Sequence, residues 1–237
     1  MLEQLKKELK SFANEDSAKI LQRYFKTGKG EYGEGDVFLG LRSQQVKDVA
    51  KKYSGIPLIK IQELLKSEIH EERMCALRIL VQKYETSEDE EKANIFNFYL
   101  KNTKKINNWD LVDISSHCII GDFLSNKNKK ILYELAKSDN LWERRIAIIS
   151  TLNFIKKENI EDTLEIAKLL LGDSHDLIHK AVGWMLREVG KKDVETLKYF
   201  LEENYDKIPR TTLRYAIERF EDGERKKLLK GKFKNGN

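Results

Sequence analysis

Apolar residues recur along this chain at the three- and four-residue spacing of amphipathic helices, in stretches of about 10 to 15 residues separated by short polar breaks. No stretch alternates between apolar and polar residues as a half-buried strand would. We therefore predict an all-α protein. The predicted helices lie at residues 2–12, 16–26, 43–53, 57–66, 71–84, 88–101, 109–124, 127–137, 142–156, 160–171, 175–190, 192–203 and 209–220.

The predicted helices are closely spaced, with about 35 to 40 residues for each pair, which is typical of HEAT and armadillo repeats. Successive pairs share little sequence, so this interpretation depends on the rhythm of the helices alone. We predict an α-solenoid of antiparallel helix pairs that spans residues 1–237 as one domain and binds a partner on its concave face. Two segments interrupt the pattern, a glycine-rich loop at 27–40 and a basic, flexible tail at 224–237.

The composition is that of a helix-rich protein with a mildly basic surface. Charged residues make up 35% of the chain, and 44 Lys and Arg against 39 Asp and Glu give a net charge of +5. This charge allows a polyanionic partner but does not require one. No run of about 18 apolar residues and no apolar leader occurs, so we expect a cytoplasmic protein. Cys75 and Cys118 lie in apolar stretches without metal-ligand spacing, which predicts reduced core thiols and no metal site.

The segment Thr27–Gly40 contains five glycines and formally reads G-x-G-x-x-G. Dinucleotide binding would require a strand before this segment and a parallel sheet around it, and neither is predicted. The segment also lacks the Gly-Lys-Ser/Thr ending of a phosphate loop. Three roles stay open: a flexible lid, a backbone-amide contact to phosphate, and a plain loop.

One carboxylate falls on a predicted buried face. Asp113 lies one turn after Trp109, inside the apolar arc of the predicted helix 109–124. The apolar members of this arc are Val112, Ile119, Ile120, Phe123 and Leu124. A carboxylate in such a position is costly unless it is paired or serves a function, and this helix alone favours a hydrogen-bonded structural role.

Two later helices carry similar exceptions. Arg145 lies on an apolar face, and a salt bridge with Asp113 across adjacent repeats is the simplest explanation of both charges. Trp184 lies at the edge of an apolar stripe beside Lys180 and Arg187. This arrangement suits a sugar–phosphate surface, and it suits an ordinary half-buried tryptophan equally well.

At these same positions the sequence resembles the AlkD family of HEAT-like-repeat alkylpurine DNA glycosylases. The blocks WDLVD, LWERR and HKAVGWMLRE, in this order, are its most specific part, and the resemblance covers nearly the whole chain. The matching segments are FLGLRSQQVKDVAKKY (38–53), NNWDLVD (107–113), SDNLWERRIAIIS (138–150), DLIHKAVGWMLREVGK (176–191) and PRTTLRYAIERF (209–220).

The resemblance implies a glycosylase that hydrolyses the N-glycosidic bond of cationic N3- or N7-alkylated purines in duplex DNA. It further implies that the enzyme needs neither base flipping nor a cofactor, and we expect a monomer. The family's cleft residues, which carry activity, correspond here to Trp109, Asp113, Arg145 and Trp184. Asn108 departs from the pattern, because the best-known members have a second tryptophan there, and the contacts of that ring are not carried over.

Other polar residues are weaker candidates. Four cations are possible phosphate contacts or, equally, parts of solvated helix faces: Lys180, Arg187, Arg210 and Arg214. His117, one turn after Asp113, is interpreted as structural, and His175 and His179 lack the Glu of a zinc-protease motif. Two other functions stay open: a non-catalytic HEAT-like protein that binds branched or distorted DNA, and a scaffold that binds proteins.

Overall fold

The computed structural model describes residues 1–233. The regular secondary-structure elements assigned within these residues are all helices. The extended pairing found in this part of the chain is one isolated bridge between Val37 and Ile69. The all-α prediction is therefore confirmed. The chain divides into two compact units, the first from Met1 to Ile119 and the second beginning at Ile120. Within residues 1–233, no helix is long and apolar enough to cross a membrane.

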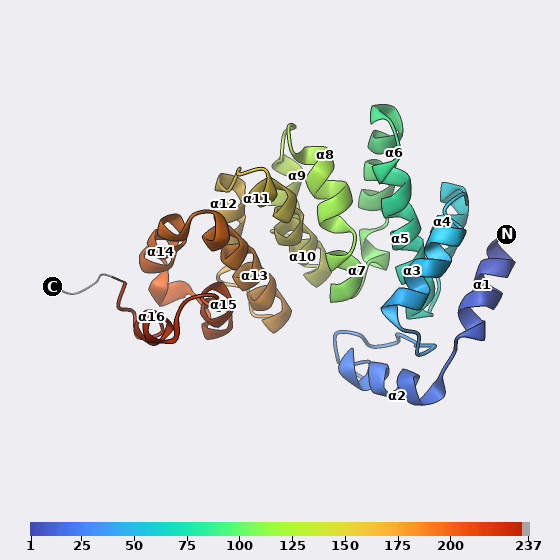
Figure 1. Cartoon of the computed structure of the whole chain (residues 1–237), viewed down its shortest axis with the longest axis horizontal. Helices are drawn as coiled ribbons and strands as arrows, with labels where there is room; N and C mark the ends of the chain where they lie inside the picture. Colours follow the sequence, from blue (N-terminus) through green and yellow to red (C-terminus); the bar gives the residue numbers. More distant parts are fainter. Residues whose placement is uncertain (234–237) are drawn as a thin grey trace. The chain divides into compact units, whose positions relative to one another are not determined.

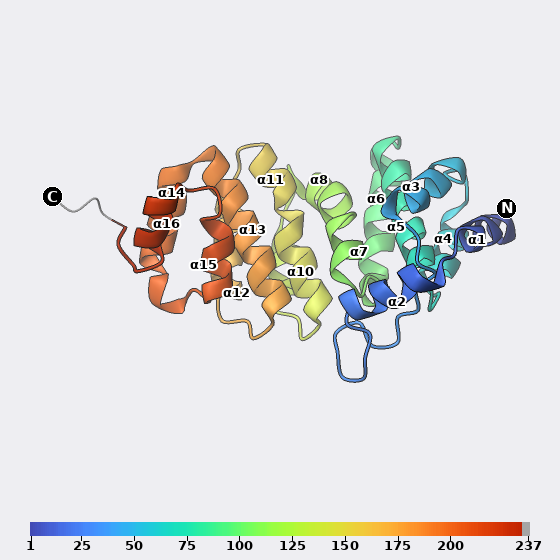
Figure 2. The same cartoon turned by 60° about the horizontal axis from the view of Figure 1, so that its bottom comes forward.

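The first unit is built around α5 (His70–Glu85), which is buried along most of its length. α3 (Ser43–Lys52) and α4 (Leu58–Leu65) pack against it. α2 (Glu15–Tyr24) has no fully buried residue and crosses near the ends of α3 and α5 (Figures 1 and 2). The other helices of this unit are α1 (Leu2–Ser11), α6 (Asp89–Lys101), η1 (Thr103–Lys105) and α7 (Trp109–Asp113).

The second unit centres on α13 (Asp176–Lys192), which packs against α10 (Leu141–Ser150) and α15 (Arg210–Ala216). Gly183 is the point of close approach, because an added Cβ would lie 2.5 Å from Tyr215 Cβ on α15. The other helices of this unit are α8 (Asp122–Leu124), α9 (Lys130–Leu135), α11 (Leu152–Lys156), α12 (Glu161–Leu170), α14 (Val194–Glu203), η3 (Tyr205–Lys207) and α16 (Asp222–Leu228).

Two segments that we predicted as single helices are interrupted. The segment 109–124 contains a π-helical stretch, η2 (His117–Gly121), and the segment 142–156 breaks at Thr151. Buried hydroxyl groups lie at both interruptions. Ser115 Oγ donates to the carbonyl four residues earlier at 2.6 Å, and Thr151 Oγ1 donates to the carbonyl three residues earlier at 2.7 Å. Such back-bonding bends helices, and it leaves no mark on apolar periodicity.

The segment predicted as a basic tail begins inside a helix. α16 covers Asp222–Leu228, and Leu228 is buried, so the first part of the predicted tail is structured. Apolar spacing missed this helix because Leu228 is its only large apolar residue. Residues 234–237, the end of the predicted tail, lie outside the described residues.

Candidate functional site

Trp109, the first residue of α7, lies in an aromatic cluster of the first unit. The ring of Phe25 stacks on it at 5.1 Å between centroids and 11° between planes. Tyr24 meets it edge-on at 5.9 Å. The Trp109 side chain is half-buried, and Tyr24 is exposed. The indole is therefore fixed from one side while part of it stays accessible to a ligand.

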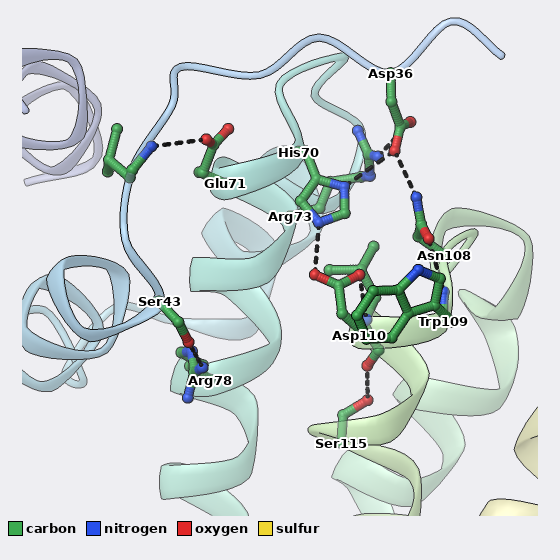
Figure 3. A network of polar contacts seen from close by, with 12 residues as sticks. Asp36, Ser43, His70, Glu71, Arg73, Arg78, Asn108, Trp109, Asp110 and Ser115 are labelled. Atoms are coloured by element: carbon green, nitrogen blue, oxygen red, sulfur yellow. Dashed lines mark hydrogen bonds and ion pairs between the residues drawn. The ribbon is translucent and has the colours of Figure 1, made fainter. Parts of the chain in front are cut away.

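A buried ion cluster lies beside this tryptophan (Figure 3). His70, at the start of α5, places its Nδ1 3.0 Å from Asp36 Oδ2 and its Nε2 2.8 Å from Asp110 Oδ2. Arg73 donates from Nη2 to Asp36 Oδ1 at 2.6 Å. Because both imidazole nitrogens face carboxylates, both act as donors and the ring is an imidazolium. Two cations and two carboxylates then balance each other inside the protein.

The pKa of His70 reflects this environment. Burial alone would lower the pKa, but Asp110 and then Asp36 outweigh it and raise the pKa from 6.5 to about 9. Burial opposes ionisation of Asp36 as well, yet His70 and Arg73 hold the pKa of that carboxyl below its usual value. His70 and Asp36 are therefore both charged at neutral pH, and the cluster joins the glycine-rich loop to α5 and α7.

Asn108, the position at which the sequence departs from the pattern it resembles, belongs to this cluster. The side chain is fully buried, and its Nδ2 donates to Asp36 Oδ2 at 3.2 Å. Its Oδ1 accepts from the backbone N–H of Trp109 at 2.9 Å. Asn108 thus begins α7 and ties it to the ion cluster, a role that a tryptophan side chain could not perform.

A stack of rings connects the ion cluster to Trp109. Phe38 stacks on the His70 imidazole at 4.4 Å between centroids and on Phe25 at 5.0 Å. Phe25 in turn stacks on Trp109. An imidazolium under an aromatic face gains a cation–π attraction in addition to its ion pairs. The position of Trp109 therefore depends on residues from α2, α5 and the loop between α2 and α3.

The end of the glycine-rich loop is fixed by one carboxylate. Both oxygens of Glu71, a buried residue on α5, accept backbone N–H groups, from Leu39 at 3.0 Å, Gly40 at 2.9 Å and Leu41 at 3.1 Å. Gly40 has a φ of +86°, and a Cβ there would lie 2.2 Å from the carbonyl oxygen of Asn14. Glycine is therefore required at this position.

The middle of the same loop uses its amides internally. The N–H of Gly28 donates to Glu31 at 2.9 Å, and the N–H of Gly30 donates to Glu34 at 2.8 Å. Among the three roles left open, these contacts count against a backbone-amide contact to phosphate, because carboxylates already occupy the donors and would repel an anion.

Asp113 is the last residue of α7 and lies one turn after Trp109. Its side chain is half-buried, whereas Val112 and Ile119 of the predicted apolar arc are fully buried. Positions four apart share a helix face, so the carboxylate and the accessible part of the indole lie on one side of α7. This is the arrangement that a cationic, ring-shaped ligand would require.

The second unit contains the other two predicted cleft residues. Arg145 on α10 is buried, and its Nη1 donates to the carbonyl of Leu177 at 2.6 Å. Trp184 on α13 is half-buried and follows Gly183, where α13 and α15 approach most closely. The roles proposed for Arg145 and Trp184 stay predictions.

The four weaker phosphate candidates differ in how far their charges are already paired. Lys180 pairs with Asp176 at 2.7 Å, and Arg187 pairs with Glu188 and Glu218. The remaining two lie on α15: Arg210 donates to the carbonyl of Leu229 at 2.6 Å, while Arg214 is exposed and has no ion-pair partner among the described residues. Arg214 is therefore the best placed of the four to bind a phosphate.

The other histidines and the cysteines make local contacts. His175 Nδ1 accepts from the N–H of Leu177 at 3.1 Å, and His179 Nε2 donates to the carbonyl of Asp173 at 2.5 Å. His117 lies beside Cys118. Burial raises the pKa of the Cys75 thiol to about 12, which makes it unreactive, whereas Cys118 is only half-buried. The expectation of two core thiols thus fits Cys75 better.

Sequence reasoning missed the ion cluster and its aromatic stack. The segment His70–Arg73 reads as a polar helix start, but all four of its side chains are buried. Asp36 lies in the glycine-rich loop, where a buried carboxylate is not expected from the sequence. The one available signal was the coincidence of four ionisable residues in a row before a long apolar helix, which is unusual for a surface segment.

A family model described as DNA alkylation repair enzyme matches residues 5–220. No curated protein matches the sequence.

Two solved structures resemble the fold. A predicted DNA alkylation repair enzyme from Enterococcus faecalis has a TM-score of 0.68 at 18% identity, over 89% of this chain and 97% of its own. AlkD2 from Streptococcus mutans has a TM-score of 0.55 at 20% identity, over 88% of this chain and 99% of its own. These likenesses confirm the predicted HEAT-like helical fold.

Proposed function

Because this chain belongs to the DNA alkylation repair enzyme family, we propose that it is a DNA glycosylase. It hydrolyses the N-glycosidic bond of cationic N3- or N7-alkylated purines in duplex DNA without flipping the base, the first step of base excision repair. The observation that carries the proposal is the pairing, on α7, of a fixed and partly accessible Trp109 with Asp113 one turn later.

The proposed chemistry needs little from the protein besides charge and position. An alkylated purine is already cationic, so it leaves without protonation and the sugar becomes oxocarbenium-like. Asp113 stabilises this positive charge and orients the attacking water. Trp109 and Trp184 present π-faces to the electron-poor deoxyribose, each contributing about 0.5–2 kcal/mol. Arg145 binds the phosphate beside the lesion.

The buried cluster supports this role indirectly. A π-face contributes to catalysis only if it is held in place before the transition state forms, because reordering a mobile side chain would offset the gain. His70, Asp36 and Asn108 hold the start of α7, and Phe25 holds the indole itself. These residues act by positioning Trp109 and do not touch the reacting atoms.

The test is single-turnover release of 7-methylguanine and 3-methyladenine from methylated duplex DNA. We expect release by the wild type and none by Asp113→Asn, with DNA affinity nearly unchanged and the fold checked by circular dichroism. Asp48→Asn, an exposed carboxylate on α3, is the matched control. No release by the wild type, with tight binding to branched DNA, would favour a DNA-structure-binding protein. No DNA binding at all would favour a protein scaffold.

A further inference from the structure

The first unit contains a cavity of about 340 Å³ between α2, α3, α5 and α7. Its walls are mainly apolar and aromatic, and they include the aromatic residues Tyr24, Phe25, Phe38 and Trp109. α2 covers it with Leu21 and Tyr24 but has no fully buried residue of its own. This volume is at the lower end of the range, about 300–1,000 Å³, that is common for small-molecule sites.

One charged side chain in this cavity, Arg78, feels the charge of Asp110 but is not paired with it in direct contact. Arg78 on α5 donates from Nη2 to Ser43 Oγ at 2.7 Å, and its Nε is buried without an acceptor (Figure 3). No carboxylate among the described residues forms an ion pair with it. A guanidinium has five N–H donors, so most of them stay available to a ligand.

The two carboxylates that also line the cavity are already occupied. Glu71 accepts three backbone N–H groups, as described above. Asp110 accepts from His70 with one oxygen and from the N–H of Leu111, at 2.8 Å, with the other. Neither competes for the donors of Arg78. The cavity therefore offers a fork of donors beside aromatic surfaces, and a flat heterocycle with two adjacent acceptors fits both features.

We propose that this cavity binds the free purine base after excision, with Arg78 as its polar anchor. The inference rests on the proposed function, because the occupant is its product. When the C1′–N9 bond breaks, its electron pair stays on N9, and the cationic base becomes neutral. In 7-methylguanine, N9 and the neighbouring N3 are then two acceptors on one edge. This edge does not exist in DNA, where N9 carries the sugar.

A phosphate is a poorer occupant of the same space. Several donors normally surround a phosphate, whereas Arg78 is the cavity's one cation with donors left over, since both nitrogens of His70 are used. The apolar and aromatic walls would add nothing to phosphate binding, but they favour a flat base, on which Tyr24 or Trp109 can stack. Trp109 lines this cavity and also carries the proposed sugar contact, so a released base would have a short path to it.

The experiment is isothermal titration calorimetry of the full chain with 7-methylguanine, 7-methylguanosine and inorganic phosphate, without DNA. We expect 7-methylguanine to bind and the nucleoside, whose N9 is blocked, to bind at least about tenfold more weakly. Arg78→Gln should weaken binding of the base by a similar factor. Arg42→Gln, an exposed arginine next to Ser43 that does not line the cavity, should bind as the wild type does.

A second variant guards against a folding defect. Leu21 is half-buried on α2, so Leu21→Trp should fill part of the cavity while the fold is kept, and it should also abolish binding of the base. No binding by the wild type at millimolar base, binding unaffected by both variants, equal binding of the nucleoside, or preference for phosphate would each overturn the inference. Excision is measured separately. Excision without binding of the free base would disprove only this inference. Binding of the base without excision would disprove the proposed glycosylase activity.

Discussion

His70 Nε2 lies 2.8 Å from Asp110 Oδ2, and Asp110 directly follows Trp109 in the chain. The buried imidazolium of His70 therefore binds the residue next to Trp109, whose ring we propose to contact the sugar.

The stability of the protein should depend on the charge of His70. Its folded pKa, about 9, exceeds the unfolded value of 6.5, so the stabilisation is fully present below about pH 6.5 and is lost as the pH rises through 9. We expect His70→Gln to be less stable at pH 6.5 by about 3 kcal/mol, because two buried carboxylates lose their cation. Urea unfolding at several pH values measures both effects.

The shape of the pH dependence separates this mechanism from simple loss of packing. In His70→Gln the decline in stability between pH 6.5 and 9 should be largely absent. His175→Asn keeps the N-cap of α13 and should retain the decline, since the pKa of His175 is lowered and not raised. An equal decline in the wild type and in His70→Gln would rule out His70 as its source.

Replacing Asn108 with tryptophan should destabilise this protein. Asn108 is fully buried, so Asn108→Trp would overpack the site and remove the donor to Asp36, for a loss of about 3 kcal/mol or more. Asn108→Ala removes the same hydrogen bonds without crowding and should cost about 1–2 kcal/mol. Both should slow excision more than they weaken DNA binding. An Asn108→Trp protein as stable as the wild type would show that the site can accommodate the ring.

Gly183 should be essential to the packing of the second unit. An added Cβ would lie 2.5 Å from Tyr215 Cβ and 2.6 Å from the carbonyl oxygen of Thr212, so Gly183→Ala should cost about 1–3 kcal/mol. Gly172 has open space around it and no positive φ, and Gly172→Ala is the matched control in the same unit. Similar urea midpoints for the two variants would argue against a close helix contact.

Arg145 and Arg214 should differ in what their removal does. Arg214 is exposed, so Arg214→Ala should leave stability unchanged and reduce the slope of log affinity against log salt by about 0.9 if it binds one phosphate. Arg145→Ala should weaken DNA binding as well, but it should also lower stability, because Arg145 is buried and bonded to Leu177. Salt titrations of DNA affinity beside urea unfolding distinguish the two. A salt slope unchanged in both would exclude phosphate contacts by either.

Apolar periodicity predicted most helices of this fold to within a few residues, because one face of each is buried against its neighbours. It failed where buried hydroxyl groups bond back to the chain, as at Ser115 and Thr151, and at α16, where few apolar residues are present. Both failures have the same cause. In each case a single hydrogen bond or a single buried side chain determines the local structure. The hydrophobic pattern of a whole helix face does not reveal such single contacts.

The candidate site was predictable only in part. Trp109 and Asp113 were identifiable because a carboxylate interrupts an apolar face and because the local motif resembles a known family. The support beneath them was not identifiable, since Asp36, His70 and Asn108 are far apart in sequence and each looks like an ordinary surface residue. Only the folded chain shows that these polar side chains neutralise one another in the interior.

The contact between Glu71 and the end of the glycine-rich loop explains what three of the loop's backbone N–H groups bind. Three successive backbone N–H groups that converge on one point form an anion-binding nest, the device that phosphate loops use. In this protein the nest already binds an anion, because the carboxylate of Glu71 on α5 accepts its hydrogen bonds in the folded chain. Leu39, Gly40 and Leu41 thus bind a carboxylate of the protein itself, and these three N–H groups are not available to a phosphate from solution.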